Sequence, residues 1–331
     1  MATIGRVDEA TAQASRERAD QDPPASAPTG KRREDRIVGA SEATRTLIAQ
    51  ATAAARAELP VWLSGPSGSD REGVARAIHS WSARSRGELV ALVCTAIPEG
   101  LQERTLFGCA AGHYPAIPGA HAGALERAAE STLFIDGIEA LRASVRDALV
   151  HAVATRAFRR AGENVERALE AKVVLATDDA GASGFAQLPH HQIRLVALAE
   201  RREDVPALAT HYLRAFADEL GIPAVGFTSD ARECLVEEPW HGDVLELRAR
   251  IREAVRLNGS GAISAEALML ARDTAPSFKE AKRAFERRYV EGLLRRCGGN
   301  ISRAARLARK DRKDFYDVLR RTGIDPSTFR E

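Results

Sequence analysis

Gly65-Pro66-Ser67-Gly68-Ser69-Asp70-Arg71-Glu72 is the most informative segment of this chain. It follows the apolar run Val61–Leu63 and precedes a helical pattern that runs from Val74 to Ile78. This order is the strand–loop–helix setting of a phosphate-binding P-loop, G-x-x-x-x-G-K-[ST]. Asp70 stands in place of the second glycine, and Arg71 stands in place of the lysine. The setting for a nucleotide is therefore kept, while the groups that would grip it are changed.

A P-loop works by aiming backbone N–H groups and a helix N-terminus at phosphate oxygens. Asp70 places a carboxylate where a phosphate would lie, and like charges there repel each other. Arg71 keeps the positive charge, but its planar guanidinium is bulkier than an ammonium group and is not interchangeable with it. Taken alone, the segment also fits a plain strand-to-helix turn, so both interpretations stay open at this point.

A second segment has the pattern of a magnesium-holding strand. Leu133-Phe134-Ile135-Asp136 is an apolar run that ends in a carboxylate, which is the Walker-B pattern. The next residue is Gly137, where a hydrolytic enzyme of this kind needs a glutamate to orient the attacking water, and Glu139 lies two residues further on. The residues predicted to line a nucleotide site are Gly65, Ser67, Gly68, Ser69, Arg71 and Asp136.

The charge of the chain is concentrated at its C-terminal end. The 331 residues leave room for one to three domains, and a hydrophobic content of 44% is ordinary. The net charge is only +2, but residues 277–331 hold 16 Lys and Arg against 8 Asp and Glu, whereas the remainder holds 32 against 38. A basic terminal segment predicts a module that binds a polyanion, although a solvated helical surface fits the charge equally well.

The cysteines and the hydropathy indicate a cytoplasmic protein without a membrane partner. No apolar run approaches membrane length, and the N-terminus has no signal-peptide core. His190-His191 has no further Cys or His at ligand spacing, so no metal site is predicted. The four cysteines lack C-x-x-C spacing and are expected to be free thiols: Cys94, Cys109, Cys234 and Cys297.

The chain divides into four predicted segments. Residues 1–35, rich in Ala, Ser, Pro and charge, are expected to form a disordered tail. Residues 36–198 alternate helical stretches with short apolar runs, which predicts an α/β fold with a parallel sheet covered by helices on both faces. Residues 199–272 show helical spacing and no convincing strand, and residues 277–331 form another helical unit. The expected strands are Val61–Leu63, Leu89–Val93, Thr132–Ile135, Val173–Ala176 and Ile193–Leu195.

The last segment has the spacing of a helix-turn-helix. A long helix from Ser277 breaks at Cys297-Gly298-Gly299, and Asn300 is placed to cap a second helix. Asp311 is placed to cap a third helix, which Gly323 ends. The turn between the two short helices carries an arginine, Arg309, where a glycine is usual, at a mild conformational cost. The alternative interpretation is an amphipathic helical hairpin with a basic face.

In the helix-turn-helix interpretation, the partner is double-stranded DNA. Arg312 and Lys313 would face the major groove from the start of the last helix, and the other basic residues would touch phosphates. The long first helix predicts dimerisation and a two-fold symmetric site. The predicted DNA-contacting residues are Arg303, Arg306, Arg312, Lys313, Arg320 and Arg321.

Several segments, in this order, resemble the sigma-54-dependent transcriptional activators, the bacterial enhancer-binding proteins of the AAA+ ATPase superfamily. The segments are Gly65–His79, Leu101–Gly108, Thr132–Ile138, Glu200–Val205, Pro239–Val255 and the C-terminal helices. The resemblance covers about residues 36–331 and implies an AAA+ α/β subdomain over 36–198, a helical lid over 199–272 and a Fis-type helix-turn-helix domain over 277–331. It also implies ATP with magnesium as cofactor, self-association into a dimer or a ring, and contact with RNA polymerase.

The chain departs from the family pattern at the working positions. The family's G-A-F-T-G-A loop is replaced by Gly112–Ile117, with Pro115 at the threonine, and the arginine-finger segment is reduced to Phe185–His191. An arginine finger alone contributes about 10³–10⁵ in rate. No catalytic residue is therefore expected, and ATP binding is predicted to be weak or absent. The altered positions that the family uses for hydrolysis are Arg71, Gly137, Asp178 and Leu245.

Three functions follow from the resemblance and the departures. The favoured one is a DNA-binding transcriptional regulator on an ATPase scaffold that no longer turns over ATP and does not engage sigma-54 in the usual way. The second is a divergent but active ATPase that remodels the sigma-54 polymerase. The third is a modulatory subunit that enters rings of active relatives, which is compatible with the first.

Overall fold

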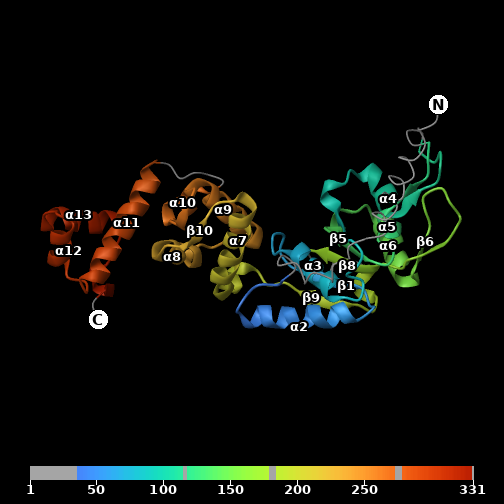
Figure 1. The fold of residues 1–331 in the computed structure, drawn as a ribbon, viewed down its shortest axis with the longest axis horizontal. Helices are drawn as coiled ribbons and strands as arrows, with labels where there is room; N and C mark the ends of the chain where they lie inside the picture. Colours follow the sequence, from blue (N-terminus) through green and yellow to red (C-terminus); the bar gives the residue numbers. More distant parts are fainter. Residues whose placement is uncertain (1–35, 115–117, 179–183, 273–277, 330–331) are drawn as a thin grey trace, which may run out of the picture.

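The structure is a computed structural model that describes residues 36–114, 118–178, 184–272 and 278–329. Three units follow one another along its long axis: an α/β unit, a mainly helical unit and a small helical bundle (Figure 1). The predicted tail, the loop residues Pro115–Ile117 and the segment 273–277 lie outside the described residues. Within the described ranges, no helix is long and apolar enough to cross a membrane.

A five-stranded parallel sheet forms the centre of the α/β unit, in the order β2-β5-β8-β1-β9. Each strand lies within two residues of a predicted apolar run. The predicted fold class, a parallel sheet with helices on both faces, is thereby confirmed. The strands are β1 (Val61–Ser64), β2 (Val90–Val93), β5 (Thr132–Asp136), β8 (Lys172–Thr177) and β9 (His191–Arg194).

Alternating side chains of these strands build two separate apolar cores, one on each face of the sheet. In β5, Phe134 packs into one core, while Leu133 and Ile135 pack into the other. The first core also contains side chains of α2 and α3, and the second contains side chains of α4, α5 and α6. The helices are α2 (Glu42–Arg56), α3 (Arg71–Trp81), α4 (Glu99–Phe107), α5 (Ala124–Arg127) and α6 (Ala143–Thr155).

Short antiparallel pairs decorate one end of this unit. Although each strand has only two residues, Phe158 packs into the second core and Cys109 is fully buried. The pairs are β3 (Gly108–Cys109) with β4 (His121–Ala122), and β6 (Ala157–Phe158) with β7 (Arg167–Ala168).

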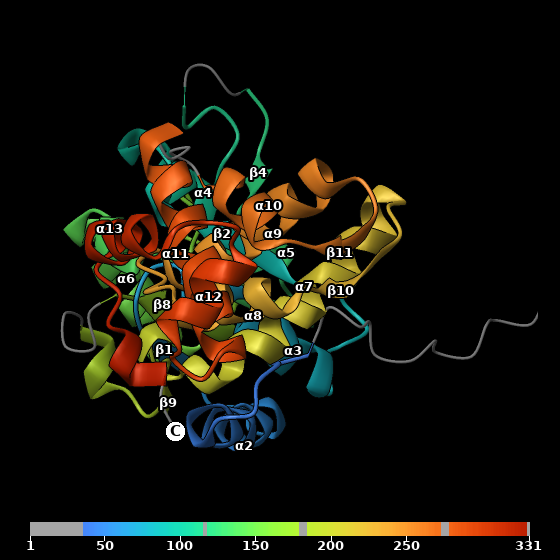
Figure 2. The ribbon, with the colours of Figure 1, turned by 90° about the vertical axis from the view of Figure 1, so that its left-hand side faces the viewer.

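Helix α2 lies along the outer edge of the α/β unit in both ribbon views (Figure 1 and Figure 2). Lys172, only 2% exposed, donates a hydrogen bond from Nζ to the carbonyl of Ala54 at 2.7 Å and also bonds to the carbonyl of Ala57. These carbonyls lie at the C-terminal end of α2, where a cation is favourable. Burial lowers the pKa of the Lys172 ammonium group.

The second unit contains four helices and, contrary to the sequence-based expectation, two strands. Strand β10 (Ala224–Phe227) pairs in parallel with β11 (Gly261–Ile263). The prediction of a strand-free segment was wrong because these strands are short and carry glycines, which leave no alternating apolar pattern. The helices are α7 (Val205–Leu220), α8 (Ser229–Glu237), α9 (Asp243–Asn258) and α10 (Ala265–Leu270).

The third unit is a bundle of three helices, seen end-on in front of the second unit in Figure 2. Helix α11 (Phe278–Arg296) is followed by α12 (Ile301–Leu307) and α13 (Arg312–Thr322). Ala304 and Ala305 are buried, which allows close approach of the helices. The buried core of the bundle consists of Val290, Leu294, Cys297, Ala304, Ala305, Phe315, Leu319 and Ile324.

Candidate functional site

The P-loop segment connects β1 to α3, as its sequence predicts. Gly68 has a φ of +97°, and Asp70 adopts a left-handed conformation with a φ of 67°. The Asp70 carboxylate accepts a hydrogen bond from the backbone N–H of Gly73 at 3.2 Å and so caps α3. In a working P-loop this helix terminus faces phosphate oxygens. Here a carboxylate of the chain itself occupies the terminus.

Arg71 is the second altered residue, and its guanidinium lies inside the site. The side chain is 7% exposed, and Nη2 lies 3.0 Å from Oδ1 of Asp136. Nη1 donates to the carboxylate of Asp178 and, at 3.2 Å, to the carbonyl of Gly65. One cation thus joins the end of the Walker-B strand, the residue after β8 and the start of the P-loop.

The sheet explains why these groups meet. Strands β5 and β8 are adjacent and parallel, with Asp136 opposite Ala176, so the carboxyl ends of both strands lie at one edge. Strand β1 is the other neighbour of β8 and ends where the P-loop begins. Sequence reasoning named Arg71, Asp136 and Asp178 separately. It missed their pairing, because residues 65 and 107 positions apart carry no local signal of contact.

Charge in this site is dominated by carboxylates. Burial raises the pKa of Asp136, while the Arg71 guanidinium opposes that rise and the neighbouring Glu139 and Asp178 add to it. Burial likewise raises the pKa of Asp70, against the hydrogen bond from Gly73. The Arg71 guanidinium is therefore the counter-ion of Asp136 and Asp178, and it offsets the repulsion between these carboxylates.

Two groups that would hold a nucleotide with magnesium are engaged by other groups of the chain. The carboxylate that would hold the metal, Asp136, is paired with Arg71, and the helix terminus that would hold phosphate is capped by Asp70. The hydroxyls of Ser64 and Ser69 are buried and have no hydrogen-bond partner among the described residues. Oδ1 of Asp136, although it lies 3.0 Å from Nη2 of Arg71, likewise makes no hydrogen bond among the described residues.

The remaining predicted positions of the site behave differently from one another. Gly137 has a φ of 72° and donates its N–H to the carbonyl of Ala176 at 3.0 Å, so it serves a tight turn. The side chain of Ser67 is exposed. Leu245 lies in the first turn of α9 with 49% of its surface exposed, and its backbone N–H donates to the carbonyl of Gly68 at 3.0 Å.

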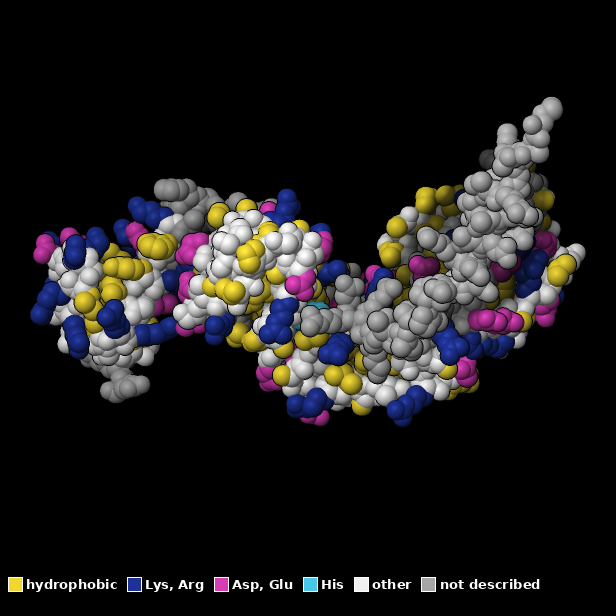
Figure 3. Space-filling view, viewed as in Figure 1, with side chains coloured by type: hydrophobic (Ala, Val, Ile, Leu, Met, Phe, Trp, Pro, Cys, Tyr) yellow, Lys and Arg dark blue, Asp and Glu magenta, His cyan; other side chains and the backbone are white. Residues whose placement is uncertain are grey.

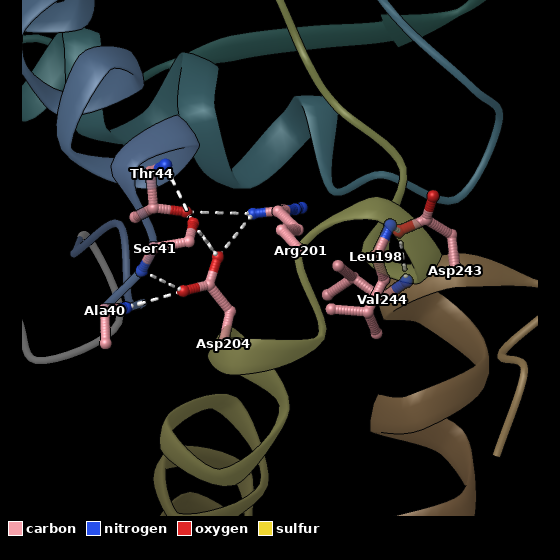
Figure 4. Close-up of polar contacts among 8 residues, drawn as sticks. All are labelled: Ala40, Ser41, Thr44, Leu198, Arg201, Asp204, Asp243 and Val244. Atoms are coloured by element: carbon pink, nitrogen blue, oxygen red, sulfur yellow. Dashed lines mark hydrogen bonds and ion pairs between the residues drawn. The ribbon is translucent and has the colours of Figure 1, made fainter. Parts of the chain in front are cut away.

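Two buried carboxylates at the junction between the first two units escaped the sequence analysis (Figure 4). Asp204 is fully buried and accepts hydrogen bonds from the backbone N–H groups of Ala40 and Ser41 at 2.6 and 2.7 Å. It also accepts from the hydroxyls of Ser41 and Thr44 at 2.8 and 2.7 Å. Burial opposes ionisation, but these bonds outweigh it, and the pKa of Asp204 is lowered. Nη1 of Arg201 lies 3.7 Å from Oδ2 of Asp204.

The second of these carboxylates belongs to Asp243, at the start of α9. It is 4% exposed and accepts from the backbone N–H groups of Leu198 at 3.2 Å and Val244 at 2.8 Å. Burial raises its pKa against those two hydrogen bonds. Its φ of 59° is a left-handed conformation that a non-glycine residue adopts at some cost.

The segment expected to contact sigma-54 is described only in part. His113 and Tyr114 form an edge-to-face pair with ring centroids 4.7 Å apart, and the Tyr114 hydroxyl lies 3.5 Å from a Glu103 carboxylate oxygen. Pro115, which stands at the family's threonine, lies outside the described residues.

His190 immediately precedes β9, and His191 is the first residue of that strand. Nδ1 of His190 lies 2.6 Å from the carbonyl of Leu188, and its ring lies near Trp62 with centroids 6.1 Å apart. The described part of the chain holds no cluster of three or more His, Cys, Asp or Glu that suits a metal ion. Trp240 is 3% exposed.

The C-terminal bundle contains two short helices, α12 and α13, joined by a turn. The Asn300 side chain accepts from the N–H of Arg303 at 3.1 Å and caps α12, whereas Asp311 precedes α13 without a side-chain capping bond. Arg309, in the turn, has a φ of 51°, the strained conformation anticipated there. Gly323, with a φ of 70°, ends α13.

Basic side chains are distributed over the face of this bundle seen in Figure 3, among apolar and acidic ones. The Arg312 guanidinium lies over the ring of Tyr316, 5.8 Å from its centroid, and Arg321 pairs with Glu286 of α11 at 2.8 Å. The six predicted DNA-contacting residues are all exposed: Arg303, Arg306, Arg312, Lys313, Arg320 and Arg321.

The sheet order, the P-loop, the Walker-B strand and the helical unit that follows define an AAA+ fold. Comparison with known proteins agrees: residues 37–188 match the Sigma-54 interaction domain, and residues 199–284 match the AAA+ ATPase lid domain. The chain is 33% identical over 317 residues to the transcriptional regulatory protein GlrR of Escherichia coli (strain K12), which covers 92% of this chain and 71% of GlrR. It is 32% identical over 301 residues to ZraR of Salmonella typhimurium, covering 86% and 68%. The chain belongs to the family of sigma-54-dependent transcriptional regulators, as the sequence resemblance predicted.

A solved structure supports the same assignment. The crystal structure of NtrX from Brucella abortus superposes with a TM-score of 0.61 at 25% identity, covering 95% of this chain and 72% of NtrX. A second NtrX structure, in complex with ATP, superposes with a TM-score of 0.62 at 24% identity. That likeness carries the fold only, and ATP binding there is a property of NtrX.

Proposed function

We propose that this chain is a DNA-binding transcriptional regulator whose AAA+ unit neither hydrolyses ATP nor engages sigma-54 through the usual loop. The family assignment supports the transcriptional role. The finer proposal depends on the charged groups inside the P-loop site and on the basic surface of the C-terminal bundle.

The single observation that carries the ATPase part is the ion pair between Arg71 and Asp136. Phosphoryl transfer in P-loop enzymes needs the Walker-B carboxylate on magnesium and a cation on the phosphates. The Arg71 guanidinium instead forms ion pairs with the chain's own carboxylates, those of Asp136 and Asp178. Gly137 provides no carboxylate to orient water, and the Leu245 side chain cannot contribute charge from the lid.

Titration calorimetry with ATP and magnesium, and with a non-hydrolysable analogue, tests this part directly. It measures affinity separately from turnover, which a coupled ATPase assay then reports. We expect no saturable heat at tens of micromolar protein and no turnover above a no-protein control. Turnover comparable to that of an active family member would instead establish the divergent ATPase.

The DNA part rests on the exposed cations of α12 and α13 and on the observed turn geometry. Arg312 and Lys313 stand at the N-terminal end of α13, the end of a recognition helix that approaches base edges. Arg303 and Arg306 stand on α12, where phosphate contacts are expected. A two-fold symmetric dimer joined through α11 would place two such helices on one operator.

Mobility-shift titration on genomic DNA fragments, repeated at several salt concentrations, tests this part. Each lost phosphate contact should reduce the slope of log affinity against log salt by about 1, whereas loss of a base contact should relax sequence preference. Binding that ignores substitution of both Arg312 and Lys313 would contradict the proposal. For the sigma-54 part, we expect no ATP-dependent open complex on a sigma-54 promoter.

A further inference from the structure

The P-loop of this chain rests directly on the lid, the unit formed by α7–α10. The carbonyl of Gly68 accepts a hydrogen bond from the N–H of Leu245 at 3.0 Å. The approach is so close that a Cβ on Gly68 would lie 2.6 Å from the carbonyl oxygen of Gly242. Backbone therefore contacts backbone across the two units, in the place where the P-loop meets the start of α9.

The junction between the units is held at two further points (Figure 4). Asp243 spans from the first turn of α9 to the N–H of Leu198, in the segment that leaves the sheet. The Asp204 carboxylate, at the start of α7, accepts hydrogen bonds from Ser41 and Thr44, which lie where the chain enters α2. Both carboxylates are buried, so moving the lid would leave their partners without hydrogen bonds in a dry environment.

We propose that the chain latches its own lid onto the P-loop through the Gly68–Leu245 contact, so that the position of the lid does not depend on a nucleotide. The proposal rests on the proposed function in one respect only, that no nucleotide is needed between the P-loop and α9. A ligand can shift a conformational equilibrium only by its differential affinity for the two states. If the chain itself holds the lid against the P-loop in the absence of nucleotide, there is no open conformation that ATP binding could convert into a closed one.

Pulsed electron–electron double resonance, which measures the distance between two spin labels, tests the latch on the full chain. Spin labels at Arg56→Cys on α2 and Arg256→Cys on α9 report the separation of the units, in a background where the partly exposed Cys234 is changed to Ser. We expect one narrow distance distribution without nucleotide, unchanged by millimolar ATP and magnesium.

Two variants address the contact itself. Gly68→Ala forces the loop away from Gly242, and we expect at least a twofold broadening of the distribution. Gly221→Ala is the matched control, because Gly221 lies in the lid with a φ of +64° and has nothing within 4 Å of its added Cβ. It also places an alanine at a positive φ, but without the collision, and should keep the narrow distribution.

Should Gly68→Ala fail to fold, Leu245→Pro removes the donor and places a ring carbon where the N–H pointed at the Gly68 carbonyl, so it breaks the contact from the other side. A first-turn N–H has no intrahelical partner, so proline at this position leaves the helix ladder intact. We expect the same broadening in this variant.

A broad wild-type distribution that narrows with ATP would overturn the latch. So would a variant of Gly68 or Leu245 that folds and keeps the wild-type distribution. Calorimetry on the same labelled protein separates this proposal from the proposed function. ATP binding at an unchanged distance would contradict the nucleotide-free site while supporting the latch, and absent binding with a broad distribution would do the reverse.

Discussion

Removal of the Arg71 charge is the perturbation that examines the altered site most directly. Arg71→Met keeps most of the aliphatic stem and deletes the cation that faces Asp136 and Asp178. We expect the variant to unfold more easily, because the cluster then holds two carboxylates without their counter-ion. Arg76→Met is the matched control, since Arg76 lies on the same helix and pairs with Glu72 at the surface, with 48% of its side chain exposed.

The magnitude follows from the geometry. At 3.0 Å between Nη2 and Oδ1, the gross attraction to Asp136 is roughly 5 kcal/mol for an effective dielectric constant of about 20. Breaking a buried pair costs about 3–5 kcal/mol, and the 22% exposure of the Asp136 side chain places the expected loss near the lower end. Asp178 is 52% exposed, so Asp178→Asn should cost less than about 1 kcal/mol, as should the Arg76 control.

Urea unfolding of the single and double variants measures these terms. Tryptophan fluorescence and circular dichroism should be followed together, because units of one chain can unfold in separate steps. In a double-mutant cycle with Asp136→Asn, we expect a coupling free energy of about 2 kcal/mol between Arg71 and Asp136. The coupling between Arg71 and Asp178 should stay below about 1 kcal/mol.

Additive changes in the free energy of unfolding for the Arg71 and Asp136 substitutions would refute this ion pair as a source of stability. Additivity would mean that the guanidinium does not neutralise the Walker-B carboxylate, and the argument against magnesium at this site would fall with it. A loss in Arg76→Met equal to that in Arg71→Met would also refute it, because the effect would then belong to helix α3 in general.

Three further predictions concern other parts of the molecule. Asp204→Asn should destabilise the chain by about 3 kcal/mol at neutral pH. Since the folded-state pKa of Asp204 is lowered, that stability is present above its ordinary value of 3.8 and is lost as the pH falls through the folded pKa, so the two urea curves should converge in acid. Asp70→Gly combined with Arg71→Lys should raise ATP affinity measurably in calorimetry, and unchanged affinity would count against the altered residues as the cause. Arg312→Ala with Lys313→Ala should weaken binding to the preferred DNA fragment at least tenfold in mobility-shift titrations, with unchanged circular dichroism as the control.

Much of the fold could be predicted because it is written in short-range patterns. Four of the five central strands are largely apolar runs of four to six residues, whereas β9, at an edge of the sheet, consists of His191-Gln192-Ile193-Arg194 and was predicted only from Ile193 onward. Asn300 predicts the start of α12 and Gly323 predicts the end of α13, because helix capping depends on adjacent residues only. The pair β10–β11 escaped because Val225, 82% exposed, and the glycines around it leave no such pattern.

The sequence alone determined the identity of the altered positions and their charge: Asp70 and Arg71 in the P-loop, and Gly137 after the Walker-B strand. Only the tertiary structure decided what those charges do. The order of the strands brings Arg71 against Asp136 and Asp178, and the docking of the lid brings Leu245 against Gly68. Patterns of a few residues specify helices and strands because those depend on local hydrogen bonding and local burial. A contact between residues a hundred positions apart depends on how whole elements pack, and no local pattern records it.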